Sequence, residues 1–410
     1  MIQIDAATRD LLMTNTIYRE IILRFPDEDF EITGENIVSE SFELAQSICD
    51  GKDFKLGGGV IGKMQIKVFD VSRNLVGLRV RAFLRVTYMQ SGGLLPSSAL
   101  TPAPTLIPGR QTATAEYPLF SGKIYRSVRN NRSTVRELTA YDKIYELSKS
   151  TFYADALTSM LDHRFGTDSV RLDSFVLAVL RTQFYDEEIL LDPTARFSYD
   201  YLLLLDRPSI YAVAGNGVNA LKFVQAYAEA EAGFLVCTAD GSLKVKSLAE
   251  LIPGSTTTRK RSVDETIRYY RELRFEEYVV QPISYAQFKY LNNKTYLYGY
   301  SKAYSWYTSD NILFRMCSSI SHFVRAYWDT NSGNYLFNDL LTFRPYNADV
   351  FARWWLEPGD RIKLVTGDSQ VQEVDSFVLS RKIKGINGMH VIIEAKANEY
   401  LGNKEVVINE

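Results

Sequence analysis

Apolar side chains recur at every second position in residues 64–71, where those at 64, 66 and 68 are separated by Gln65 and Lys67. Period two over this length is typical of a β-strand that buries one face. The pattern continues over residues 78–89. The chain also holds 26 Tyr and 22 Phe, which fit the half-buried surface of a sheet. We therefore predict a β-rich protein.

Helical periodicity is confined to the middle of the chain and to one later segment. Apolar residues recur three and four positions apart after Thr139, and helices are expected up to residue 185 and again at 216–232. Asp240-Gly241 lies between two apolar runs and predicts an antiparallel β-hairpin. A long helix is expected at 310–328, with Asp310 as its N-cap.

At 410 residues, the chain exceeds the roughly 250–300 residues that one hydrophobic core accommodates. We therefore predict an α+β, β-rich multidomain protein. The expected units are a strand-rich domain over residues 1–145, a small helical domain over 146–210, a helix with a β-hairpin and a linker over 211–264, and a second strand-rich domain with the one long helix over 265–410.

The composition gives no sign of a membrane protein, a nucleic-acid-binding protein or a disulfide-rich protein. The net charge is −2, so no global charge favours an anionic partner. No window approaches the roughly 20 apolar residues of a membrane helix, and the first residues lack the features of a signal peptide. Cys49, Cys237 and Cys317 are too few and too far apart for a disulfide framework or a zinc site. We expect assembly in a cytoplasm, without stable membrane association.

Two glycine-rich segments have the spacing of nucleotide-binding motifs. Residues 57–63 match a phosphate-binding loop, but Met64 stands where that loop needs Ser or Thr, and a strand follows in place of a helix. Residues 215–220 fit the dinucleotide fingerprint, with Asp240 near the distance expected for a ribose-binding acid. The hairpin at Asp240, however, does not continue a parallel sheet. A glycine-rich turn and a capped helix packed on a hairpin are therefore favoured, and we expect no cofactor.

No residues form a recognisable catalytic or metal-binding motif. The histidines, His163, His322 and His390, have no partner at metal-ligand spacing. Acidic runs such as 186–188 and Glu276-Glu277 are better explained as exposed carboxylates than as the paired acids of a glycosidase. We therefore predict that the chain is not an enzyme and has no catalytic or metal-binding residues.

Four stretches, in this order and spacing, resemble the phage tail hub or baseplate hub family. This family includes the N-terminal structural part of the tail-associated lysins of phages that infect Gram-positive bacteria, and it is similar to contractile-tail hubs and to the spike base of type VI secretion. The stretches are residues 32–44 followed by Ser47-Ile48-Cys49; residues 120–124 leading to 138–142; the helix at 218–231 with Gly233-Phe234 and Asp240-Gly241; and residues 356–362 followed by Ser380-Arg381, Gly385 and 391–395.

The resemblance implies a structural protein of a tail tip. It implies a ring-shaped homotrimer in which each subunit holds two related β-barrel-like hub domains, near the start and the end of the chain. Three subunits then present six similar barrels, which match a hexameric tail tube or distal tail ring to a trimeric tip. Lysin members continue into a hydrolase or a fibre, so we expect the spike, fibre or lytic protein of this tip to be a separate chain.

The same resemblance implies a channel through the ring. The channel would admit the tape-measure protein and, in transit, DNA. A densely basic lining would retard DNA because Lys and Arg bind phosphates, so we expect a lining without such a coat. The implied location is the tail tip or baseplate of the virion.

Aromatic residues are candidates for the interfaces between subunits. Packing within the sheets explains them equally well. The segment 91–118, rich in Ser, Thr, Pro and Gly, is expected to form an exposed loop or a β-arm that contacts a neighbouring ring. Alternative functions are a tail-associated cell-wall hydrolase and a cell-wall carbohydrate-binding tip protein. The candidate interface residues are Tyr296, Tyr298, Tyr300, Tyr304, Trp306, Trp354 and Trp355.

Overall fold

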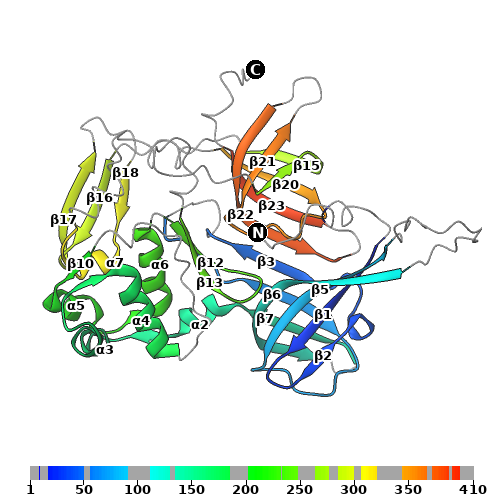
Figure 1. Cartoon of the computed structure of the whole chain (residues 1–410), viewed down its shortest axis with the longest axis horizontal. Coiled ribbons are helices and arrows are strands. Elements are labelled where there is room, and N and C mark those ends of the chain that lie inside the picture. The colour runs from blue at the N-terminus through cyan, green and yellow to red at the C-terminus, as the bar shows by residue number, and fades with distance from the viewer. Residues whose placement is uncertain are drawn as a thin grey trace, which may run out of the picture.

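The computed structural model describes residues 9, 17–49, 56–90, 111–129, 134–184, 202–231, 233–247, 264–276, 285–299, 306–320, 344–366, 372–386 and 390–397. Most of the strands in these ranges belong to one mixed 13-stranded sheet, which Figure 1 shows beside a group of helices. The α+β, β-rich class predicted from the sequence is confirmed. Within the described ranges, no helix combines the length and the apolar character needed to cross a membrane.

The main sheet joins strands from both ends of the chain. Its path runs β15, β20, β23, β22, β3, β4, β7, β6, β5, β1, β2, and β14 and β21 attach to it through β22. The strands are β1 (Tyr18–Phe25), β2 (Phe30–Ile32), β3 (Glu43–Ser47), β4 (Lys63–Val68), β5 (Arg79–Gln90), β6 (Gln111–Arg129), β7 (Arg136–Tyr141), β14 (Glu265–Ile267), β15 (Tyr270–Phe275), β20 (Arg344–Phe351), β21 (Arg361–Thr366), β22 (Gln372–Lys384) and β23 (His390–Ala397).

Strand β4 confirms the alternation read from the sequence. Met64, Ile66 and Val68 are fully buried, whereas Lys67 is exposed. Burying such a side chain stabilises the fold by roughly 1.5–3 kcal/mol. Because successive side chains of a strand point to opposite faces, this short segment settles which face of the sheet is turned to the core.

The N-terminal half of the sheet curls on itself. The segment 30–38 begins with β2, which pairs with β1. Further along the segment, Ile37 forms a bridge with Val68 at the end of β4. The short 3-10 helix η1 (Gly34–Asn36) makes the corner between the two pairings. One bent segment therefore spans from β1 at one side of this half to β4 at the other.

The C-terminal half is built in a similar way. Its bent segment carries β14, which pairs in parallel with β21, and β15, which pairs with β20. Only residues 268 and 269 separate β14 from β15, and these two strands do not pair with each other. The two halves are thus curled sheets, each spanned by a bent segment. In the described residues no ladder closes either half into the barrel expected from the resemblance.

Strand β22 belongs to both halves. Its first part pairs with β21, from Gln372 opposite Thr366 to Phe377 opposite Arg361. Its last part pairs with β3, from Ser380 to Lys384. Buried apolar residues of the two halves form one cluster, in which Ile66 and Val378 are both fully buried. The two ends of the chain therefore share one ladder and one core.

A helical unit lies to one side of the sheet (Figure 1). Its core is a second cluster of buried apolar residues, to which Phe175, Phe223 and Phe234 contribute. Its elements are α2 (Lys143–Lys149), α3 (Ala154–Met160), the π-helical η2 (Leu161–Phe165), α4 (Leu172–Phe184), α5 (Arg207–Ala214), α6 (Ala220–Ala230) and the hairpin of β12 (Gly233–Cys237) with β13 (Leu243–Ser247).

Short strands complete this unit, and some come from far along the chain. Ala286 and Phe288 of a three-stranded sheet are buried in the same core. The unit boundaries expected at residues 145, 210 and 264 remain predictions. The short elements are β8 (Thr151–Phe152), β9 (Ser169–Arg171), β10 (Leu202–Leu205), β11 (Val218–Asn219), β16 (Tyr285–Tyr290), β17 (Lys294–Gly299), β18 (Trp306–Ser309), α7 (Ile312–Arg315) and β19 (Cys317–Ser319).

The prediction of a long helix at 310–328 is wrong. The helix α7 is one turn long, its N-cap is Asn311 and not Asp310, and β19 begins at Cys317 and pairs with β10. Asn311 also donates hydrogen bonds to the Ala226 carbonyl (2.7 Å) and to the half-buried Glu229 carboxylate (3.1 Å). Tertiary contacts therefore override the helical period here. Residues 321–328 lie outside the described residues.

Candidate functional site

Residues in or beside all four stretches that carry the resemblance meet at one junction. Gln46 lies on β3, Ser121 on β6, and Gly241 at the tip of the hairpin β12–β13, where a Cβ would come within 2.7 Å of the Ser121 hydroxyl. Arg381 lies on β22, and the turn 352–360 connects β20 to β21. The junction is therefore where the two halves of the sheet and the helical unit touch.

Arg381 lies at the centre of this junction and is 1% exposed. Its guanidinium donates to the Gln46 side-chain oxygen (2.8 Å), to the carbonyls of Trp354 (2.8 Å) and Leu356, and to the Leu119 carbonyl (3.4 Å). Burial lowers the pKa of Arg381, and the charges of Glu357 and Asp360 act in the opposite direction. One planar side chain thus fixes β3, β6 and the 352–360 turn to β22.

A buried ion pair attaches the hairpin β12–β13 to the same turn. The Lys246 ammonium lies 3.0 Å from an Asp360 carboxylate oxygen, and the Asp360 side chain is fully buried. Lys246 also donates to the Pro358 carbonyl (3.0 Å), and Asp360 accepts from the Glu357 amide (2.7 Å). The carboxylate of Glu357 in turn accepts from the Ala239 amide of the hairpin (3.0 Å).

Gly359 permits the close packing of the turn against the hairpin. Its φ is +82°, a region that disfavours side chains, and a Cβ would lie 2.4 Å from the Phe234 ring. The same Cβ would lie 2.9 Å from Lys246. The polar groups of the junction are thus held by packing that only glycine allows at this position.

The chemistry of the junction is structural. Its cations and carboxylates donate to or accept from each other and the backbone, so none is presented to a substrate. Removing one partner of a buried ion pair costs about 3–5 kcal/mol because the other charge stays buried and unpaired. The junction therefore fixes how the two halves of the sheet and the helical unit are oriented.

Asp142 holds a second contact between β7 and the loop before β4. It is 2% exposed, its side chain accepts from the amides of Gly62 (2.8 Å) and Ile144 (3.1 Å), and it forms the N-cap of α2. Burial raises the pKa of Asp142 from 3.8 to about 8, against the effect of these backbone donors. A Cβ at Gly62 would come within 2.4 Å of this carboxylate.

The first glycine-rich segment packs against protein and leaves no phosphate site. The Gly57 amide donates to the Gly233 carbonyl and the Leu235 amide to the Gly58 carbonyl, both at 2.7 Å, so the segment pairs beside β12. A Cβ at Gly57 would lie 2.5 Å from the Gln225 carbonyl of α6. The prediction of a glycine-rich turn is therefore confirmed. The absence of a side chain at Gly57 allows the backbone of this segment to pack directly against α6.

The second segment is the predicted capped helix packed on a hairpin. Asn219 accepts from the amides of Leu221 (3.1 Å) and Lys222 (3.3 Å) at the start of α6. Strands β12 and β13 are antiparallel, so Asp240 does not follow a strand of a parallel dinucleotide-binding sheet. Burial raises the pKa of Asp240, but hydrogen bonds from Thr238 and Ser242 outweigh it and leave the pKa lowered.

The histidines and cysteines are not arranged for catalysis where the structure describes them. His163 lies on η2, His390 begins β23, and His322 lies outside the described residues. All three cysteines are buried and unpaired with each other, and burial raises the pKa of Cys237 and Cys317, which disfavours the thiolate. In the described ranges, no three His, Cys, Asp or Glu side chains are arranged to hold a metal ion.

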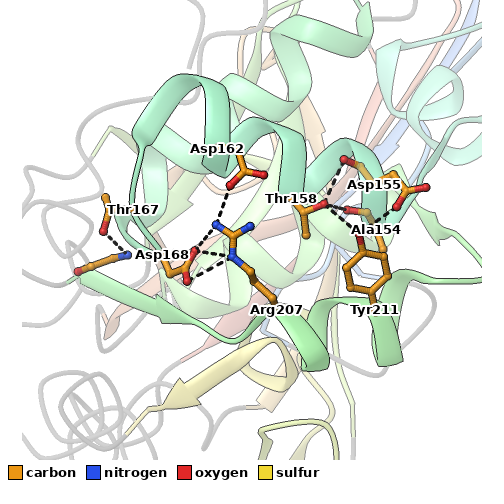
Figure 2. A network of polar contacts seen from close by, with 9 residues as sticks. Ala154, Asp155, Thr158, Asp162, Thr167, Asp168, Arg207 and Tyr211 are labelled. Atoms are coloured by element: carbon orange, nitrogen blue, oxygen red, sulfur yellow. Dashed lines mark hydrogen bonds and ion pairs between the residues drawn. The ribbon is translucent and has the colours of Figure 1, made fainter.

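A polar network in the helical unit joins its carboxylates to an arginine (Figure 2). The Arg207 guanidinium lies 2.8 Å from Asp162 and 2.9 Å from Asp168. Its hydrogen bond to Asp162 lowers the pKa of that carboxyl. The Tyr211 hydroxyl donates to Asp155 at 3.0 Å. Arg207, at the start of α5, thus links Asp162 of η2 and Asp168, which precedes β9.

The candidate interface residues fall into three groups. Trp354 and Trp355 are 4% and 1% exposed, and the Trp355 indole donates to Glu265 (3.1 Å). Both side chains therefore pack in the core that the two halves of the sheet share. Tyr296 is half-buried against the core of the helical unit. The backbones of Tyr298 and Trp306 belong to β17 and β18, whereas their side chains, and all of Tyr300 and Tyr304, lie outside the described residues.

The segment 91–118, expected to form an exposed loop or a β-arm, is in part a strand. Residues 111–118 belong to β6, which pairs with β5 from Lys123 opposite Arg79 to Gln111 opposite Gln90. Figure 1 shows these two strands extending beyond the body of the sheet. Residues 91–110 lie outside the described residues, and a contact of this arm with a neighbouring ring remains a prediction.

Sequence reasoning gave no role to Arg381, Lys246 or Gln46. Only a partial signal for Arg381 was present: it lies two residues before the buried Ile383 on β22, but a bulge between Val378 and Ser380 interrupts the alternation, and Leu379 packs in the core of the helical unit. An arginine at an inward position of an alternating strand indicates a buried, fully hydrogen-bonded guanidinium. No comparable signal identifies its acceptors, since three of the four are backbone carbonyls.

No family model matches the sequence, and no curated protein matches it. Solved structures similar to the chain include a tail protein from Neisseria meningitidis MC58, with 9% identity and a TM-score of 0.48 over 94% of this chain and 98% of that one. A 43 kDa tail protein of prophage MuSo2 from Shewanella oneidensis has 8% identity and a TM-score of 0.48 over 92% and 98%. A prophage tail protein from Listeria monocytogenes EGD-e has 10% identity and a TM-score of 0.45 over 95% and 96%. At these values the similarity assigns no function by itself.

Lys246→Met is expected to lower the free energy of unfolding by about 3–5 kcal/mol, because Asp360 would stay buried without its cation. Chemical denaturation measures the loss. The control is Lys363→Met, which breaks the exposed pair of Lys363 with Glu373 and should cost about 1 kcal/mol or less. Equal losses in the two variants would contradict the role of the junction.

Asp142→Asn tests the buried carboxyl. The folded-state pKa of Asp142, about 8, exceeds its ordinary 3.8, so the wild type binds this proton more tightly when folded and loses stability as pH rises from about 4 to 8. Relative to the variant, its free energy of unfolding should fall by up to about 1.4 kcal/mol per pH unit. Denaturation at pH 5, 6.5 and 8 measures the difference. If the free energy of unfolding of the wild type, relative to that of the variant, stayed constant or rose with pH, the prediction would be contradicted.

Proposed function

We propose that the chain is the structural hub of a phage or phage-like tail tip. The observation that carries the proposal is the continuity of one sheet through two curled halves, with the ladder of β3 and β22 and the guanidinium of Arg381 at the point where they join. Such a subunit transmits force between its two halves without a hinge. The resemblance of the four stretches supports the tail-hub assignment, and each stretch supplies residues in or beside this junction.

The symmetry of the proposed ring follows from the two halves. Each is a curled sheet spanned by a bent segment, residues 30–38 in one and 264–276 in the other. Three subunits would present six such units at similar radius. A ring of this kind matches a hexameric tail tube or distal tail ring on one side to a trimeric tip on the other.

The proposed partners follow from the same assignment. The subunit would form a homotrimer, with the tail tube or distal tail ring above it and a spike, fibre or lytic protein below. Its channel would pass the tape-measure protein and DNA during genome ejection. Assembly would take place in the host cytoplasm, and the finished ring would belong to the tail tip of the virion.

The proposed role is not enzymatic. The groups at the junction are engaged with each other, the described cysteines are buried, and the carboxylates in Figure 2 share Arg207. These contacts join elements of the chain to one another, which supports a role in assembly over that of a cell-wall hydrolase or a carbohydrate-binding protein.

Native mass measurement tests the assembly. The purified chain should give a species of three times the 46.7 kDa subunit mass, and negative-stain images should show a ring around a hole. A dilution series provides the control, since an obligate ring keeps its mass well below micromolar subunit concentration. A monomer at the highest attainable concentration, together with its absence from tail particles, would refute the proposal.

Incubation with peptidoglycan tests the alternative of a hydrolase. The assembled chain should release no soluble muropeptides, and the yield should equal that of a heat-denatured sample. A known lytic enzyme in a parallel digest shows that the substrate is cleavable. Release that depends on the folded chain would establish the enzyme and remove the purely structural role.

A further inference from the structure

A small pocket lies where the two halves of the sheet meet, beside the 352–360 turn. The space in it that is open to a water-sized sphere is about 20 Å³. One water molecule needs roughly 10–15 Å³ of such space, whereas the ligand-binding clefts of proteins have roughly 300–1,000 Å³. Both halves supply its wall: Arg19, Leu84 and Leu119 come from β1, β5 and β6, Ile383 and Val391 from β22 and β23, and Trp354 from the turn.

Trp354 brings a buried hydrogen-bond donor to this wall. The residue is 4% exposed, and its indole nitrogen has no acceptor among the described residues. The ring packs against Tyr117 and Trp355, each with 5.4 Å between ring centroids. The neighbouring Trp355 differs, because its indole donates to Glu265 (3.1 Å). A buried N–H without an acceptor weakens the folding equilibrium about tenfold, so the Trp354 nitrogen calls for a partner from outside the chain.

Two carbonyls of wall residues can accept the hydrogens of a water molecule. The Phe42 carbonyl accepts from the Gly385 amide (2.8 Å), and the Leu119 carbonyl accepts from the Arg381 guanidinium (3.4 Å). A carbonyl oxygen has two lone pairs, so each of these oxygens can accept one bond more. A water molecule that accepts from Trp354 and donates to one or both carbonyls then makes two or three hydrogen bonds, which is usual for buried water.

We propose that this pocket holds one ordered water molecule, hydrogen-bonded to the Nε1 atom of Trp354. A neutral ligand requires no unbalanced charge on the wall, so the site does not depend on the charge of Arg19. Because the wall is drawn from both halves of the sheet, the water would link the 352–360 turn to the segment before β3 or to β6, in addition to the ladder of β3 and β22. The inference concerns the interior of one chain and does not rest on the proposed ring.

A crystal structure of the whole chain, at a resolution that shows ordered water, tests the site. A single density peak is expected within about 2.7–3.2 Å of Trp354 Nε1, the usual length of an N–H···O hydrogen bond. An empty pocket, or a protein atom that accepts from Nε1 in its place, would overturn the proposal. Neither result would bear on the ring, which native mass measurement tests separately.

Two matched variants show whether the indole nitrogen holds the water. Trp354→Phe removes the donor and keeps an aromatic ring, so the peak should disappear, since an apolar pocket stays dry. Trp355→Phe removes an indole that already has a protein acceptor, so the peak beside Trp354 should remain. A peak that persists in Trp354→Phe, or that is lost only in Trp355→Phe, contradicts the assignment. Thermal melts establish that each variant is folded, and the wild-type density decides if one is not.

Discussion

The ladder between β3 and β22 is the contact on which the rest of the structure depends. It joins segments at opposite ends of the chain, from Ser47 opposite Ser380 to Glu43 opposite Lys384. Arg381 reinforces it from within, because its guanidinium reaches acceptors on β3, β6 and the 352–360 turn. A flexible linker between the halves would have allowed them to move independently. A shared strand, with a buried cation that donates to four acceptors, fixes their orientation.

The helical unit is attached by charge and shape together. The buried pair of Lys246 with Asp360 brings the hairpin β12–β13 to the turn, and Gly359 lets the two backbones approach. Buried ion pairs are costly to form and more costly to break, so they favour one arrangement over alternatives. In the proposed ring this property would be useful, since small changes of angle within each copy would prevent three copies from closing.

Local patterns were read correctly from the sequence, whereas contacts distant in sequence were not. The alternation at Met64, Ile66 and Val68 and the hairpin at Asp240-Gly241 depend on neighbouring residues, and both were predicted. The helix at 310–328 failed because Asn311 and the pairing of β19 with β10 fix that segment from outside it. Trp354 and Trp355 were interface candidates because an apolar ring suits a core and an interface alike. The role of Arg381 depends on carbonyls from two other parts of the chain, the 352–360 turn and β6, which no local pattern reveals.

Native-state hydrogen exchange tests most directly whether the two halves are one cooperative body. The amides of β3 and those at 380–384 of β22 should exchange with the same free energy as global unfolding, because their ladder opens only when the whole sheet does. In Arg381→Met, protection in both halves should fall by the same free energy. Protection lost in one half while the other keeps its full value would show two independent sheets and contradict the account.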